Sequence, residues 1–247
     1  CSSAGDQGTV ILVGAKAEQR MQEIMYPMPD SIDDRLKPRM GYRKKIANQI
    51  ADAVTKVYPY MSEHIDWDPA FAHKMEKTEL SRRLISMEDV NEALKEAEGY
   101  RKEYEKMLKE LNDNPSLKEK PRWYRDITRT YTFIRRGESV KERYDIEKVQ
   151  PRLPIEIHVV RIGDIVFATN PFELYLDYGM RIKARSPAIQ TFLIQLAGGG
   201  TYLPTVRSIE GGAYGAVPAS TLIGPEGGQE LVEKTLELIN AVMPADK

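Results

Sequence analysis

Hydrophobic and polar side chains alternate most regularly in the last hundred residues of the chain. In residues 155–160, isoleucine or valine recurs at every second position, which is the period of a half-buried strand. Gly163-Asp164 predicts a turn, and the apolar run 165–168 predicts the returning strand. A third strand is expected over residues 190–196. This region therefore predicts a small β-sheet.

Helical spacing replaces this alternation at two places in the same region. After Asn170-Pro171-Phe172, a helix is expected to begin near Glu173, because a carboxylate in a first helical turn is favoured by the helix dipole. Residues 230–242 predict a closing helix. Its inward face is expected to carry Leu231, Thr235, Leu238, Ile239 and Val242. The fold class predicted is α/β, a mixed sheet with packed helices.

Residues 84–150 are more charged and predict a helical hairpin inserted into this α/β domain, which would span 1–247. Ser86 and Asp89 have the spacing of a capping box, and a near-heptad apolar stripe follows over 86–112. Its buried face is expected to include Val90, Leu94, Tyr104 and Leu108. Two uses of the stripe remain open, docking on the chain's own domain and self-association through helix 86–112.

Proline and glycine positions predict the limits of the remaining helices. Pro121 is expected to start the second helix of the hairpin, and Gly137 to interrupt it. Near the beginning, the run 9–14 fits a strand or a helix start, and the proline-rich stretch 27–38 predicts a loop. Residues 40–57 predict a helix, which Pro59 is expected to end.

Composition narrows the function classes. The 247 residues suffice for one large domain with an insertion, and the net charge of −1 argues against a nucleic-acid-binding protein, which needs clustered cations. No apolar run approaches the roughly 18 residues of a membrane-spanning helix. A single cysteine, Cys1, excludes an internal disulfide framework.

The beginning of the chain leaves three interpretations open. Cys1 followed by two serines fits a trimmed fragment, or a bacterial lipoprotein acylated on this cysteine after signal removal. A third interpretation is an N-terminal nucleophile hydrolase, in which the thiol attacks and the α-amine acts as base. A secreted, periplasmic or lipid-anchored envelope location is expected, and a cytoplasmic one stays open.

Two loops have the composition of a functional site. One is the junction 169–173, where Pro171 fixes the chain direction just before Glu173. The other is the segment 198–205, whose three glycines allow tight turns or a close approach to a ligand. The lysine and spacing of a phosphate-binding P-loop are missing from this loop.

Four motifs resemble a known family in its own order. The run 161–173, Arg-Ile-Gly-Asp through Pro-Phe-Glu, resembles the "RIGD…PGE" segment of neutral/alkaline ceramidases and their bacterial relatives. Residues 202–205, Tyr-Leu-Pro-Thr, are similar to the family's "Y-(V/L)-P-T" loop. Within 214–225, a tyrosine followed by Ala-Ser-Thr and Gly-Pro resembles "YE-ASTxxGP". The opening residues 4–7 resemble the family's "GDQ" loop.

The resemblance implies a zinc-dependent amidohydrolase. Glu173 and Tyr202 match two family zinc ligands, and two histidines upstream of the "GDQ" loop complete the set, so the implied partner is an N-terminal half of the same domain. Zinc-bound water would then attack an amide carbonyl, such as that of an N-acylated lipid. The complete enzyme is expected to hold zinc and this chain alone none. Surface or structural roles are expected for His64, His73 and His158.

The same resemblance implies substrate-contacting loops. They contain Gly5, Asp6, Gln7, Gly199, Gly200, Thr201 and Tyr214. Gly8 stands where ceramidases have a serine, and Phe172 where they have a glycine, which favours a relative with another substrate. The alternatives are a non-catalytic ceramidase-like module and the Cys1 hydrolase. Because Glu173 and Tyr202 each follow a strand, both side chains are expected to point into one concavity.

Overall fold

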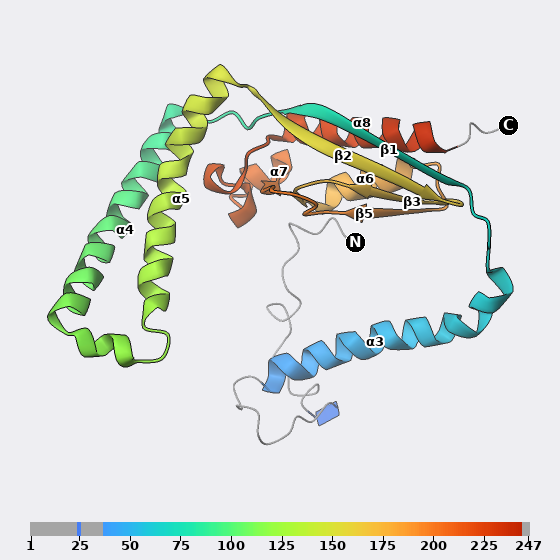
Figure 1. Cartoon of the computed structure of the whole chain (residues 1–247). Coiled ribbons are helices and arrows are strands. Elements are labelled where there is room, and N and C mark those ends of the chain that lie inside the picture. Colours follow the sequence, from blue (N-terminus) through green and yellow to red (C-terminus); the bar gives the residue numbers. More distant parts are fainter. Residues whose placement is uncertain (1–23, 26–36, 244–247) are drawn as a thin grey trace. The chain divides into compact units, whose positions relative to one another are not determined.

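The computed structural model describes residues 24–25 and 37–243 (Figure 1). The described residues fall into two compact units, one that ends at Pro69 and one that begins at Ala70. The expectations for the run 9–14 and for most of the loop 27–38 lie outside the described residues. None of the described helices is both long enough and apolar enough to cross a membrane.

The smaller unit contains one long helix, α3, from Lys37 to Met61, followed by a short 3-10 helix, η1, Ser62–His64. The helix expected over 40–57 is confirmed. Pro59 does not end it, because the helix continues to Met61. Proline disturbs the hydrogen bonds of the turn before it, but in a last turn few backbone bonds remain to be lost.

A four-stranded mixed sheet forms the centre of the larger unit, in the order β1-β2-β3-β5. β2 and β3 form the expected hairpin, with Gly163 in the left-handed conformation, φ 59°, that a tight turn requires. β5 pairs in parallel with β3, so the sheet is mixed as predicted. The strands are β1, Phe71–Ser81; β2, Arg152–Ile162; β3, Ile165–Thr169; and β5, Gln190–Ile194.

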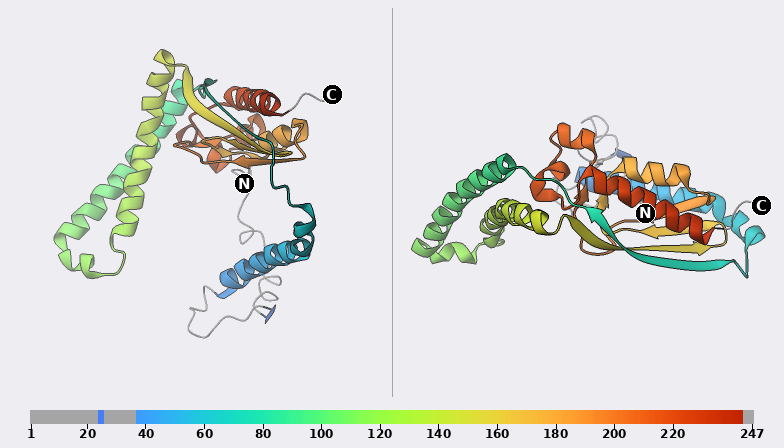
Figure 2. Two further views of the ribbon diagram at one scale, coloured as in Figure 1. Left: turned by 45° about the vertical axis from the view of Figure 1, so that its right-hand side comes forward. Right: turned by 90° about the horizontal axis from the view of Figure 1, so that it is seen from above.

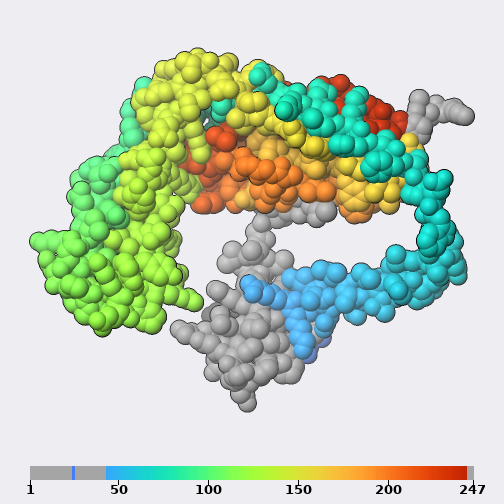
Figure 3. Space-filling view, viewed as in Figure 1, coloured from blue at the N-terminus to red at the C-terminus, as the bar shows by residue number. Residues whose placement is uncertain are grey.

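The sequence pattern did not predict strand β1, which pairs with β2 along its whole length. β1 is an edge strand, and charged residues alternate with apolar ones on both of its faces. On the helix-covered face, Glu76 forms an ion pair of 2.9 Å with Lys234 of helix α8 instead of an apolar contact. β1 lies next to β2 at the surface of the molecule in Figure 3. Charged edge strands limit pairing with other chains, and they obscure the period of two.

Two helices cover one face of the sheet, α6 (Leu176–Arg185) and α8 (Pro225–Val242). They pack beside each other, as Figure 2 shows. α8 begins five residues before the predicted 230 because Pro225 follows Gly224 at the first helical position, where proline is favoured. The five side chains expected to face inward are all buried: Leu231, Thr235, Leu238, Ile239 and Val242.

The helical hairpin is confirmed between β1 and β2. It consists of α4 (Met87–Asp113) and α5 (Tyr124–Val149), joined by a turn with the 3-10 helix η2 (Pro115–Glu119). Ser86 and Asp89 form the predicted capping box: the Ser86 hydroxyl accepts from the Asp89 amide, and the Asp89 carboxylate accepts from the Ser86 amide. This capping box satisfies two backbone amides that would otherwise lack a partner at the start of α4.

The predicted buried face of α4 is only half right. Val90 is buried and Tyr104 is half-buried, but Leu94 and Leu108 are 38% and 37% exposed. The helix packs mainly against its partner α5, and Ala97 is buried in that contact. A narrow seam between two helices holds fewer positions than a stripe on a wide core, which is why leucines next to the seam stay exposed.

Gly137 does not interrupt α5, and Pro121 does not start it. α5 begins at Tyr124 after a turn, and Gly137 is buried in its interior. A Cβ at Gly137 would lie 2.6 Å from the carbonyl oxygen of Ala93 and 2.9 Å from the Cβ of Ala97. The glycine therefore permits the close approach of the two helices. In a single sequence, a glycine at a helix contact and a glycine that breaks a helix look the same.

Candidate functional site

Glu173 and Tyr202 lie opposite each other on a second, two-stranded sheet. Strand β4 is Glu173–Leu174 and strand β6 is Tyr202–Leu203, and they pair in parallel with Glu173 in register with Tyr202. The expectation that Glu173 lies in a helical turn is wrong. Its amide donates to the carbonyl of Thr201 at 3.0 Å, which keeps the chain extended until α6 begins at Leu176.

The junction before Glu173 is fixed by backbone hydrogen bonds to the end of β5. The buried Asn170 donates its amide to Ile194 and accepts at its carbonyl from Ala197, both at 2.9 Å. Its side-chain oxygen accepts from the amide of Phe172 at 3.1 Å. Phe172 itself is fully buried in the core. The Phe172 side chain therefore anchors the junction to the core.

Gly200 permits the approach of the two short strands. A Cβ on Gly200 would overlap the carbonyl group of Pro171, whereas a Cβ on Gly199 would meet nothing within 4 Å. The next residue, Thr201, accepts at its hydroxyl from the amide of Leu222 at 2.9 Å. The glycine-rich loop thus holds Tyr202 against Glu173. A β-strand pair joining two loops has no recognisable period and could not be predicted from the sequence.

The Tyr202 hydroxyl is held in its neutral form. Partial burial, and then a hydrogen bond with the Glu173 carboxylate, raise the pKa of Tyr202 to about 12. The ring is packed edge-on against two other tyrosine rings, with centroids 6.4 Å from Tyr175 and 6.2 Å from Tyr214. The Tyr202 hydroxyl therefore donates a hydrogen bond to the Glu173 carboxylate across the two-stranded sheet. The two side-chain oxygens lie within hydrogen-bond distance of each other.

Tyr214 links this pair to the helical hairpin. Its ring is 69% exposed and lies under the guanidinium of Arg136 from α5, 4.6 Å from the ring centroid. Arg136 also hydrogen-bonds the Ser220 hydroxyl, which in turn donates to the Tyr214 carbonyl. The predicted substrate-loop residue is thereby fixed between the sheet and the hairpin by a cation–π contact.

Two further arginines hold the same loop, and no local motif predicts either of them. Arg143 donates to the carbonyls of Pro218 and Thr221 at 2.8 and 3.2 Å, and Arg83 donates to the Ala216 carbonyl. Burial lowers the pKa of both guanidiniums. They come from the hairpin and from the chain just after β1, far from the loop in sequence. Only the fold brings them together.

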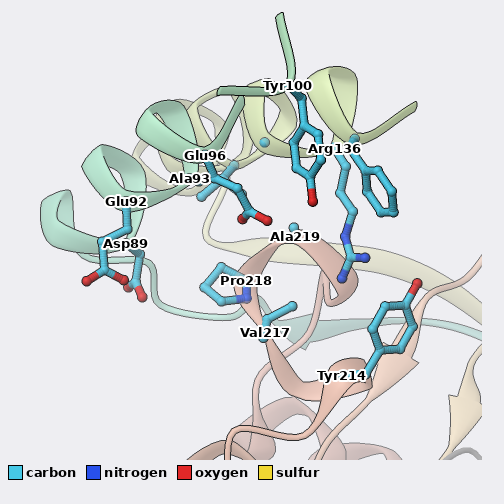
Figure 4. A pocket seen from close by; sticks show the side chains of 13 residues that line it. Asp89, Glu92, Ala93, Glu96, Tyr100, Arg136, Tyr214, Val217, Pro218 and Ala219 are labelled. Carbon is cyan, nitrogen blue, oxygen red and sulfur yellow. The ribbon is translucent and has the colours of Figure 1, made fainter. Parts of the chain in front are cut away.

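A cavity of about 440 Å³ lies where the hairpin meets this loop (Figure 4). Tyr214 and Arg136 stand on one side of it, and Glu92 and Glu96 project from α4 on the other. Neither Glu173 nor Tyr202 lines this cavity; the Tyr214 ring lines it and contacts the Tyr202 ring, and so lies between the cavity and the pair. The remaining lining residues are Asp89, Ala93, Tyr100, Phe133, Gly137, Val140, Val217, Pro218 and Ala219.

Glu173 and Tyr202 are too few donors to hold a zinc ion by themselves. Glu173 and Tyr202 offer one carboxylate and one phenol oxygen, whereas protein zinc sites use three or four ligands, mostly nitrogen and sulfur. Within the described ranges, no group of three or more His, Cys, Asp or Glu side chains is placed to hold a metal. The predicted substrate-loop residues Gly5, Asp6 and Gln7 lie outside the described residues.

Comparison with known proteins adds no relative. No family model, no curated protein and no solved structure matches this chain.

Proposed function

We propose that this chain supplies part of the active site of a zinc-dependent amidohydrolase of the neutral ceramidase type. One observation carries the proposal: the two positions whose motifs resemble family zinc ligands, Glu173 and Tyr202, stand in register and share a hydrogen bond. They come from separate loops with no local reason to meet. A resemblance without functional content would not require their oxygens to converge.

The two oxygens fit one side of a zinc coordination sphere. Carboxylate oxygen is an ordinary zinc ligand, and the proton that Tyr202 shares with Glu173 occupies the place where a cation would be held. We propose that two histidines from a segment upstream of the Gly5-Asp6-Gln7 loop complete the set. A zinc ion bound there would lower the pKa of a water molecule and polarise an amide carbonyl.

The chain's own residues have three tasks in this proposal. Glu173 supplies a carboxylate and accepts a hydrogen bond from the neutral Tyr202 hydroxyl in the metal-free state. Tyr214, held by Arg136, forms the wall between the Glu173–Tyr202 pair and the cavity, so that the organic part of a substrate would lie against its ring. The helical hairpin lines that cavity, and the four family motifs have no counterpart for it. It would therefore set substrate choice.

The test uses the complete gene product, because the proposal places two ligands upstream. Zinc content is measured by mass spectrometry and hydrolysis with a fluorogenic N-acyl amine. Glu173→Gln should lower zinc content and hydrolysis together by about tenfold or more, and Tyr202→Phe should do the same. Glu210→Gln, an exposed glutamate of the short helix α7 (Val206–Glu210), and Tyr58→Phe, an exposed tyrosine of α3, are the matched controls.

Two results would redirect the proposal. Zinc retained in full by Glu173→Gln and Tyr202→Phe would contradict the ligand roles. A complete protein that binds no zinc and hydrolyses no amide would favour a non-catalytic module with this fold.

Self-association through α4 is a separate proposal, supported by the exposed Leu94 and Leu108. Sedimentation of the wild type and of Leu94→Ser tests it, and a monomer at all concentrations would contradict it.

A further inference from the structure

Two of the three histidines of the chain meet on the sheet surface that α6 and α8 leave uncovered. His73 on β1 and His158 on β2 are diagonal neighbours in the register, since His73 pairs with Val160 and Met75 with His158. Their Nε2 and Nδ1 atoms are 3.0 Å apart. The neighbours of His158 on β2, Ile157 and Val159, are buried in the core, and Ala72, the neighbour of His73 on β1, packs against the same core. The histidine pair therefore faces outward.

The carboxylate of Glu156 fixes the orientation of one ring. It lies 2.7 Å from Nε2 of His158. A carboxylate accepts, so Nε2 carries the proton and Nδ1 of His158 presents its lone pair to His73. This arrangement of carboxylate, imidazole and an outward lone pair is the one that orients metal-binding histidines. Glu156 and His158 remain accessible, with side chains 44% and 38% exposed.

The two rings lie edge to edge. They are parallel within 3°, with centroids 5.3 Å apart. The two nitrogens thus stand between the rings, and the ring faces do not stack on each other. The backbone supports this position, because the amide of His158 donates to the Thr169 hydroxyl at 3.0 Å and β1 pairs with β2 throughout. Because the two strands are already paired, the two histidines are held near each other before any ligand binds.

We propose that His73 and His158 form a binding site for a divalent transition-metal ion of the nickel or copper type, with Glu156 as the outer partner of His158. Two nitrogens about 2.0–2.1 Å from one ion at a right angle lie about 2.9 Å apart, close to the observed 3.0 Å. Tetrahedral coordination would need about 3.3 Å. Right-angle coordination is that of tetragonal nickel and copper sites.

Binding requires only one exchange and one small movement. His73 changes tautomer by exchange with solvent, its proton passing from Nε2 to Nδ1, and the metal ion enters between Nε2 of His73 and Nδ1 of His158 with water filling the other positions. A rotation of the exposed rings turns both lone pairs to the same point. The site shares no residue with the Glu173–Tyr202 pair, so it stands or falls independently of the proposed hydrolase.

Nickel titration of the 247-residue chain tests the site. Cys1 is replaced by serine in every protein, because a terminal thiol binds nickel. The expected result by calorimetry is one Ni²⁺ per chain. His73→Gln and His158→Gln should each weaken binding by about tenfold or more, and Glu156→Ala by about tenfold. His64→Gln, which removes the third histidine, should leave the affinity unchanged.

Circular dichroism of each variant verifies that the sheet is intact, and the substituted side chains are exposed, so folding should be retained. Unchanged nickel affinity in His73→Gln or His158→Gln would overturn the proposal. Loss of the affinity in His64→Gln would overturn it as well, because binding would then belong to the smaller unit. Absence of nickel binding to the parent protein at millimolar concentration would also overturn it.

Discussion

Replacing Gly200 with alanine should separate the two strands that bring Glu173 and Tyr202 together. The new Cβ would overlap the backbone carbonyl of Pro171 and lie 3.0 Å from the amide nitrogen of Phe172. Backbone atoms cannot turn aside as a flexible side chain can. The hydrogen bond from the Glu173 amide to the Thr201 carbonyl, now 3.0 Å, would therefore be lost or lengthened.

The expected loss of stability follows from these contacts. Inserting a methyl group into a packed site costs about 1–3 kcal/mol, and a lost backbone hydrogen bond adds about 1 kcal/mol. The free energy of unfolding of Gly200→Ala should thus fall by about 2–4 kcal/mol. Gly199→Ala is the matched control, because its Cβ meets nothing within 4 Å. That variant should be neutral or more stable by up to about 1 kcal/mol.

Urea unfolding followed by circular dichroism measures both variants in the full chain. A second readout reports on the site itself: in Gly200→Ala, the pKa of Tyr202 should fall from about 12 toward its ordinary value, because the hydrogen bond with Glu173 is weakened. NMR of labelled tyrosine follows this titration. Equal stability of Gly200→Ala and Gly199→Ala, with an unchanged Tyr202 titration, would refute the reasoning.

Three other predictions concern the hairpin and its contacts with the sheet. Gly137→Ala should destabilise the chain by about 1–3 kcal/mol relative to Gly99→Ala, which adds a methyl to the open face of α4 and gains helix propensity; equal urea midpoints would argue against the tight helix contact. Burial is the first cause that raises the pKa of both Tyr178 and Tyr202 to about 12. The free energy of unfolding should therefore keep its full value below about pH 10 and fall as the pH rises toward 12. A free energy of unfolding that does not change over this range would contradict these shifts. Arg143→Ala should lower the unfolding free energy by about 2 kcal/mol or more, because two charged hydrogen bonds to buried carbonyls are lost; a thermal midpoint unchanged from wild type would show that the loop is held by other contacts.

The sequence predicted the elements whose period is clean. Strand β2 has apolar residues at alternate positions, β3 is a short apolar run after a turn, and α8 has apolar residues at helical spacing from Leu231 onward, so all three were expected close to where they occur. The capping box at Ser86 marked the start of α4. Each of these signals is local. A local signal is sufficient when one face of an element is buried and the other is solvated.

The sequence predicted which residues form the candidate site, but it did not predict the strands and contacts that hold them in place. Motif resemblance singled out Glu173 and Tyr202, but their two-residue strands are too short for any period to show. The loop-holding arginines, among them Arg143, are separated from the loop by many residues and act through backbone carbonyls. The same holds for His73, because β1 was not predicted and its pairing with β2 places this histidine beside His158.

The most direct test of the central claim is the position of zinc in the complete protein. Anomalous X-ray scattering at the zinc absorption edge locates the ion without assumptions about ligands. The account predicts one strong peak about 2 Å from a carboxylate oxygen of Glu173 and from the hydroxyl oxygen of Tyr202, with two histidine nitrogens completing the coordination. A zinc peak remote from both residues, while their oxygens still share a hydrogen bond, would contradict it.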